Sequence, residues 1–196
     1  SGVIMASILK VNTIQDATNS NTALTISSTG EIEQTQMTVA MFAPSDNHDA
    51  SSGTITMGSS SHKAWISLND DSDWSFKNIG SPPTFDSNGI FTFPSTGVYE
   101  INHMVGWYGT NDLAYAGSSI DISENSGGAY SSQFFYTQLE NYGATGYASV
   151  CGFLLVNVTD ASTFRARFRL DHSGSVTVRN KYYSKTTFKK IASVQT

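Results

Sequence analysis

A short segment near the C-terminus combines side chains suited to holding a saccharide or an apolar surface. It contains the adjacent tyrosines Tyr182 and Tyr183, with Asn180, Lys181 and Lys185 beside them. Tyrosine offers rigid amphipathic area for stacking on sugar rings, whereas asparagine and lysine hydrogen-bond hydroxyls or meet an anionic polysaccharide. Because neighbours in a strand face opposite ways, the alternative is that one tyrosine packs in the core and the other is ordinary surface.

Two further sets of side chains extend this chemistry. Asn125 and Tyr130 complete the first candidate group, in which Tyr182 and Tyr183 are expected to be central. The second candidate group is aromatic and consists of Trp107, Tyr108, Tyr115, Tyr142 and Tyr147.

Catalytic and metal-binding patterns are missing from the sequence. It has no Gly-x-Ser-x-Gly elbow, no His-Glu-x-x-His pair, no glycine-rich phosphate loop and only one cysteine. Enzymes that cleave polysaccharides need paired carboxylates, and the acids here are sparse and scattered. The four histidines are far apart in sequence, and His103 is expected to be hydrogen-bonded or at an interface rather than a ligand. Residues 69–73 are acidic enough for calcium, although a polar hairpin turn is the preferred interpretation. We therefore expect no enzyme activity, no cofactor and no metal.

Charge is distributed unevenly along the chain. The net charge is -5, yet residues 161–196 hold eight of the eleven basic side chains and a single acid, Asp171. A basic segment of this kind can bind nucleic acid, but charge complementarity between strands or subunits is the preferred explanation. No run of about 18 apolar residues occurs, so insertion into a membrane is not expected either.

Composition divides the chain into two parts. Charged residues make up only 14% and hydrophobic residues 39%, because Ser, Thr, Asn and Gly fill the difference, which is typical of a β-rich extracellular surface. Residues 1–61 have few apolar side chains and are expected to form an extended fibre or attachment segment with a linker. Residues 62–196 show short strands separated by turn residues, the pattern of an all-β sandwich or barrel.

Ten strands are expected in residues 62–196, and no amphipathic helix. They are Lys63–Leu68, Asp73–Lys77, Gly89–Phe93, Gly97–Tyr108, Ser118–Ser123, Ser131–Leu139, Ala148–Val158, Thr163–Leu170, Ser175–Arg179 and Thr186–Ser193.

Residues 85–99 carry a family resemblance. Phe85, Gly89, then Phe91-Thr92-Phe93-Pro94, then Gly97-Val98-Tyr99 resemble the hallmark of the globular heads of complement-type and tumour-necrosis-factor-like proteins. The proline ends a short strand because it cannot donate to a ladder, and the glycine turns the chain. The resemblance implies an antiparallel jelly-roll sandwich that assembles as a homotrimer. The family's Gly-Asp turn is absent here.

Two shorter pieces look like tail-fibre proteins of marine bacteriophages. They are residues 8–16 near the start and residues 63–68 before the head. With the head pattern, they favour a non-enzymatic receptor-binding head of a viral tail fibre that attaches to a polysaccharide or protein of the host surface. The N-terminal segment would then join other tail proteins, and the protein would be located in the extracellular virion. The alternatives are a purely structural virion component and, disfavoured by the lack of a signal-peptide pattern, a secreted cellular head.

The resemblance also makes neighbours of two strands in the inner sheet. Alternation in residues 164–170 puts Arg165, Arg167 and Arg169 on the face opposite the apolar residues, and Asp121 lies on the matching face of its own strand. We expect Asp121 to pair with Arg167 or an adjacent arginine; the alternative is a row of solvated arginines.

Strand direction places the candidate groups. Antiparallel alternation along the expected ten strands carries the loops at 124–131, 159–163 and 180–186 to the end distal from the stalk. It places the loops at 109–117, 140–147 and 171–175 near the stalk. The first candidate group is therefore expected at the distal end and the second at the stalk end.

Overall fold

The structure is a computed structural model that describes residues 13–15, 22–26, 32–33, 37–51, 53–69, 72–73, 76–109, 115–137 and 146–194. The chain separates into two compact units, Ser1–Met37 and Thr38–Thr196. The first unit contains a small antiparallel sheet in the order β1-β2-β3, formed by β1 (Thr13–Gln15), β2 (Thr22–Ile26) and β3 (Ile32–Glu33). The described part of the chain contains no helix with the length and apolar character needed to span a bilayer.

The second unit begins well before the expected boundary between residues 61 and 62. Three of its strands lie in the segment predicted as fibre and linker: β4 (Thr38–Pro44), β5 (His48–Ala50) and β6 (Gly53–Thr56). Strand β4 buries Ala40, Phe42 and Ala43 and pairs with two other strands. The prediction was wrong because the serines, Pro44 and the glycines of this region were taken for linker composition, although they join short strands.

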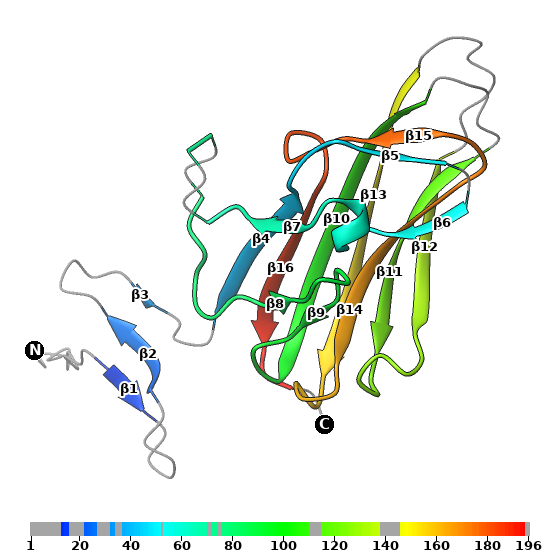
Figure 1. Cartoon of the computed structure of the whole chain (residues 1–196). Helices are drawn as coiled ribbons and strands as arrows, with labels where there is room; N and C mark the ends of the chain where they lie inside the picture. Colours follow the sequence, from blue (N-terminus) through cyan, green and yellow to red (C-terminus); the bar gives the residue numbers. More distant parts are fainter. Residues whose placement is uncertain are drawn as a thin grey trace, which may run out of the picture. The chain divides into compact units, whose positions relative to one another are not determined.

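Two antiparallel sheets form the sandwich of the second unit (Figure 1). The seven-stranded sheet contains β4 and β5 together with β7 (Trp65–Ser67), β10 (Gly97–Gly109), β13 (Gly146–Val158), β15 (Val176–Val178) and β16 (Lys185–Ala192). The six-stranded sheet contains β6 together with β8 (Thr84–Phe85), β9 (Phe91–Thr92), β11 (Ala116–Ser123), β12 (Ser131–Thr137) and β14 (Arg165–His172). A single 3-10 turn, η1 (Ser60–His62), precedes β7.

The all-β antiparallel prediction is confirmed, but the strand count of ten is wrong. The described part of the second unit has thirteen strands, β4 to β16. Strands β4, β5, β6 and β8 were not predicted, and the strand expected at Asp73–Lys77 is absent, since Asp73 lies in a turn and Lys77 outside any strand. The other nine predicted strands agree with the structure to within a few residues.

The residues that carry the family resemblance lie at the centre of the core. Phe91 is fully buried, with ring centroids 5.0 Å from Phe42 and from Phe188 and 5.6 Å from Trp65. Gly89 has φ +75°, and a Cβ there would lie 2.4 Å from the carbonyl oxygen of Met57. Only glycine fits this turn, which delivers Phe91 to the core.

His103 joins the two sheets across the interior. Its Nδ1 lies 2.7 Å from Thr186 Oγ1 in the seven-stranded sheet, and its Nε2 lies 2.9 Å from Ser118 Oγ in the six-stranded sheet. Complete burial lowers the pKa of His103 to about 3, so the imidazole is neutral. His103 is therefore a hydrogen-bonded core residue.

Candidate functional site

The two ends of the sandwich are defined by the register of β10. At its start, Gly97 pairs with Val158 and Tyr99 with Lys190, which in turn pairs with Thr38 of β4. We call this the Thr38 end; the opposite end, where β10 finishes, is the Gly109 end. The loops at 124–130 and 159–164 meet at the Thr38 end, where the amide of Ser126 donates to the carbonyl oxygen of Thr163 at 2.8 Å.

The loop at 179–184 lies at the Gly109 end, contrary to prediction. Strands β15 and β16 both pair antiparallel with β10, at Val178↔Trp107 and Lys185↔Met104. They therefore run in the same direction along one side of β10, and residues 179–184 loop out between them (Figure 1). The prediction treated the two strands as a hairpin, which reversed the direction of the chain.

This arrangement splits the first candidate group. Asn125 and Tyr130 lie at the Thr38 end, while the members at the Gly109 end are Asn180, Lys181, Tyr182, Tyr183 and Lys185. Since Thr38 opens the second unit, the loops predicted as distal at 124–131 and 159–163 lie at the end where the chain enters that unit. The loops predicted near the stalk lie at the other end.

The structure instead combines the 179–184 loop with part of the second candidate group. A cleft of about 560 Å³ at the Gly109 end is lined by residues that include Gly106, Trp107, Tyr147, Arg179, Tyr182 and Tyr183. We call it the Arg179 cleft. The ring of Tyr108 lies 5.6 Å from that of Tyr147. Tyr115 is exposed at the same end, beside Ser173, and Tyr142 lies outside the described residues.

Arg179 is the cation of this cleft. Its guanidinium carbon lies 4.3 Å from the ring centroid of Tyr183 and 5.6 Å from that of Tyr147, both within the range of cation–π attraction. Its Nε is buried and has no hydrogen-bond partner among the described residues, and the same holds for Nε1 of Trp107. The cleft therefore presents unused hydrogen-bond donors next to aromatic rings.

Close approach of the loop to β10 fixes the position of Arg179 and Tyr183. The amide of Arg179 donates to the carbonyl oxygen of Gly106 at 2.8 Å, and the amide of Gly106 donates to Ser184 Oγ at 3.0 Å. A Cβ on Gly106 would lie 2.9 Å from Cβ of Tyr183 and 3.0 Å from its carbonyl oxygen. Glycine at this position is what allows the loop to lie against the sheet.

The outer side of the 179–184 loop is tied to residue 73. Lys181 Nζ lies 2.7 Å from Asp73 Oδ2, and the hydroxyl of Tyr182 donates to the same oxygen at 2.8 Å. Hydrogen bonds from Lys181 and Tyr182 hold the pKa of Asp73 below its usual value. The exposed acidic segment at 69–73 thus contributes to holding the loop.

Asp121 lies at the centre of an ionic cluster on the six-stranded sheet. Its side chain is fully buried and accepts hydrogen bonds from Arg169 Nε and, at 3.0 Å, from Arg167 Nε. Ser119 Oγ donates to it at 2.8 Å. Burial raises the pKa of Asp121, but the hydrogen bonds from Arg169, Ser119 and Arg167 outweigh burial and lower the pKa below its usual value.

The predicted arginine row is thus only partly engaged with Asp121. Arg165 points elsewhere and donates to the carbonyl oxygens of Phe164 and Ser162. Tyr130, expected to contact a receptor, lies over Arg167 with its ring centroid 3.8 Å from the guanidinium carbon. Tyr130 therefore covers the ionic cluster.

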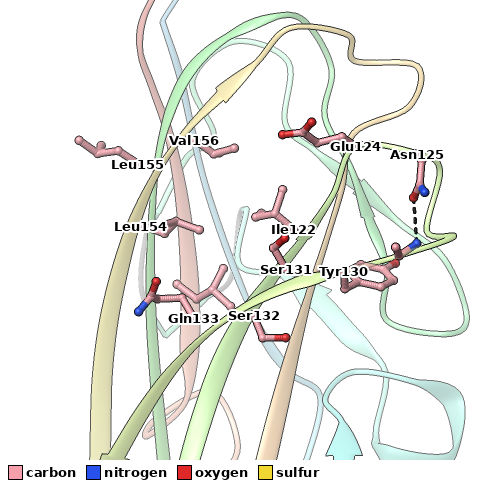
Figure 2. A pocket seen from close by; sticks show the side chains of 12 residues that line it. Ile122, Glu124, Asn125, Tyr130, Ser131, Ser132, Gln133, Leu154, Leu155 and Val156 are labelled. Carbon is pink, nitrogen blue, oxygen red and sulfur yellow. Dashed lines mark hydrogen bonds between the residues drawn. The ribbon is translucent and has the colours of Figure 1, made fainter.

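A second cleft, of about 580 Å³, opens between the edge strands β12 and β13. We call it the edge cleft; Figure 2 shows Ile122 and Leu154 pointing into it, with Asn125 and Tyr130 at one side. Asn125 Oδ1 accepts a hydrogen bond from the amide of Ala129 at 2.9 Å and so shapes its own loop. On the outward face of β13, Phe153 and Leu155 are 66% and 55% exposed.

No described residues form a metal centre of three or more His, Cys, Asp or Glu side chains. His48 and His62 do approach, with ring centroids 4.8 Å apart, and burial together with the charge of His62 lowers the pKa of His48. The residues that sequence reasoning missed are Arg179 and Gly106. Arg179 directly precedes Asn180, and its place beside the predicted tyrosines was the one available signal.

Comparisons with known proteins support the fold. No protein-family model matches the sequence, and a search of curated proteins gave no match. Among solved structures, Eiger TNF from S. frugiperda is similar with a TM-score of 0.57 at 13% identity, covering 82% of this chain and 96% of that chain. Murine APRIL at pH 8.0 is similar with a TM-score of 0.56 at 11% identity, covering 80% of this chain and 100% of that chain. At such identities the likeness shows a TNF-like jelly-roll fold alone.

Proposed function

We propose that the chain is a non-enzymatic attachment head of a viral tail fibre, which binds a ligand on the host surface through the Arg179 cleft. The observation that carries the proposal is the cleft itself. Three tyrosines, Tyr147, Tyr182 and Tyr183, are 69%, 50% and 47% exposed around a guanidinium that no described acid neutralises. Exposed tyrosines beside a positive charge are typical of surfaces that bind polar ligands.

The location of the cleft supports a role in attachment. It opens at the Gly109 end, whereas the chain enters the head at Thr38, at the opposite end of β10. A ligand site at this end is reached without crossing the connection to the N-terminal unit. The fibre origin itself follows from the resemblance of residues 8–16 and 63–68 to phage tail-fibre proteins.

The proposal includes a homotrimer, as the resemblance of residues 85–99 implies. Strand β13 is thirteen residues long and pairs with β10 alone among the described strands. Its outward face exposes Phe153 and Leu155, and the edge cleft beside it is lined by Ile122, Leu154 and other apolar residues. A long edge strand with exposed apolar side chains favours association, so further copies of the chain are the proposed partners at this edge. Three copies would present three clefts and gain avidity.

Binding of the fluorescently labelled full chain to a panel of bacteria tests the proposal. We expect saturable binding to the host strains, and competition by surface polysaccharide or protein extracted from those strains. The absence of saturable binding to any strain that the virus infects would contradict it and would leave the purely structural virion component as the better explanation.

A further inference from the structure

We infer that the Arg179 cleft takes a saccharide bearing a carboxylate, such as a uronic-acid residue of an acidic polysaccharide. The inference rests on the proposed attachment function and names the chemical class of its ligand. The carboxylate would accept hydrogen bonds from Arg179, and the sugar ring would lie against the exposed tyrosines.

The state of Arg179 calls for an anion. Its side chain contacts two aromatic rings but donates no hydrogen bond to any described residue, and its Nε is buried. The other arginines of the described chain, Arg165, Arg167 and Arg169, all donate hydrogen bonds to protein oxygens. A half-buried guanidinium without an acceptor loses hydration with no return, and a ligand carboxylate would restore those hydrogen bonds.

The aromatic rings select a saccharide rather than a small inorganic anion. Tyr147 and Tyr183 lie against the guanidinium, and more than 45% of each side is open to solvent, with Tyr147 at 69% and Tyr183 at 47%. The cleft holds about 560 Å³, which is enough for more than one pyranose ring. Nε1 of Trp107, which is also without a partner among the described residues, adds a donor for a ring hydroxyl.

The local charge favours a monoanion over a phosphate or sulfate polymer. Arg179 is the one cation that lines the cleft in the described chain, and the neighbouring Lys181 is already paired with Asp73 at 2.7 Å. A planar carboxylate matches the two-pronged geometry of a single guanidinium and needs no second cation. The net charge of -5 further opposes dense polyanions.

Calorimetric and saturation-transfer NMR titrations of the full chain test the inference. The probes are a β-linked oligosaccharide of glucuronic acid, one of galacturonic acid, a neutral glucose oligosaccharide of the same length, and a sulfated one. The variants are Arg179→Gln, which removes the charge, and Arg179→Lys, which keeps the charge but loses the planar fork. Arg165→Gln is the matched control, because Arg165 lies at the Thr38 end and donates only to backbone carbonyls.

We expect at least one uronate to bind, and Arg179→Gln to weaken it by about 10- to 100-fold, the range for loss of hydrogen bonds between charged groups. Arg179→Lys should fall between, and Arg165→Gln should match the wild type. The inference is overturned if neither uronate binds, if the neutral or sulfated sugar binds as tightly, or if Arg179→Gln binds like the wild type. Cell binding measured in parallel separates the two claims: cells bound without uronate binding sink only the ligand class, and uronate binding without cell binding sinks only the attachment function.

Discussion

At the scale of single residues, strand alternation predicts pairing but not burial. Alternation placed Asp121 and the arginines on matching faces, and the structure brings Asp121 together with Arg167 and Arg169. It did not separate Arg165, whose guanidinium turns to the carbonyl oxygens of Phe164 and Ser162. Arg179 was not singled out because its burial depends on Tyr147 and Tyr183, which are brought together only by the tertiary fold.

Replacing Asp121 by Asn tests the ionic cluster. The change leaves two arginines around a neutral amide, and we expect a loss of about 2 to 3 kcal/mol of unfolding free energy, less than for a fully buried pair because the arginines retain some contact with water. The pKa of Asp121 is lowered, so its contribution is complete above about pH 4 and is lost as the pH falls through the folded-state pKa. Urea denaturation measures this, with the exposed Glu124→Gln as control. A loss below about 0.5 kcal/mol would contradict the structural role.

His103 gives a prediction in the mildly acidic range. Its folded-state pKa is about 3, below the unfolded value, so the unfolded chain binds the proton more readily and stability falls as the pH decreases below about 6.5. This residue alone should remove about 2 kcal/mol between pH 7 and pH 5. We expect His103→Gln, compared by urea denaturation at both values, to lose that part of the pH dependence. An unchanged pH dependence would show that His103 is not buried and neutral.

At the scale of elements, the nine strands that alternate clearly were predictable and the connections between them were not. Strand β4 escaped prediction because its buried positions, Ala40 and Phe42, are embedded in a segment of low hydrophobicity. The 179–184 loop was misplaced because the sequence cannot distinguish a hairpin from an outward loop between two strands of the same direction. That distinction depends on pairing with β10, which is distant in sequence.

Gly106→Ala tests the element that positions the cleft. The added Cβ would lie 2.9 to 3.0 Å from the backbone and Cβ of Tyr183, so the 179–184 loop must move away from β10. We expect faster hydrogen exchange at the amides of Arg179 and Gly106, and weaker binding to host cells. Gly128→Ala, in the loop at the Thr38 end, serves as the control. Unchanged exchange at both amides would mean that the loop is not held by this contact.

At the scale of the whole molecule, assembly accounts for the apolar surface that a single head leaves exposed. Light scattering should give a mass of about 63 kDa for the full chain, three times 21.1 kDa. Phe153→Asp would place a charge in the proposed contact between copies and should shift the mass toward that of one chain. Thr159→Asp, an exposed change just after β13, is the control. A stable 21.1 kDa species for the wild type at micromolar concentration would contradict the homotrimer.

The most direct test of the account compares host-cell binding by variants at the two ends of the sandwich. In the first variant Tyr147 and Tyr183 are both replaced by Ala, which empties the Arg179 cleft; in the second, Asn125 and Gln133, which line the edge cleft, are both replaced by Ala. Both should keep the mass of the wild type. The account predicts that the first variant loses binding to host cells and that the second binds like the wild type. Full binding by the first variant, or loss confined to the second, would contradict the assignment of the ligand site to the Arg179 cleft.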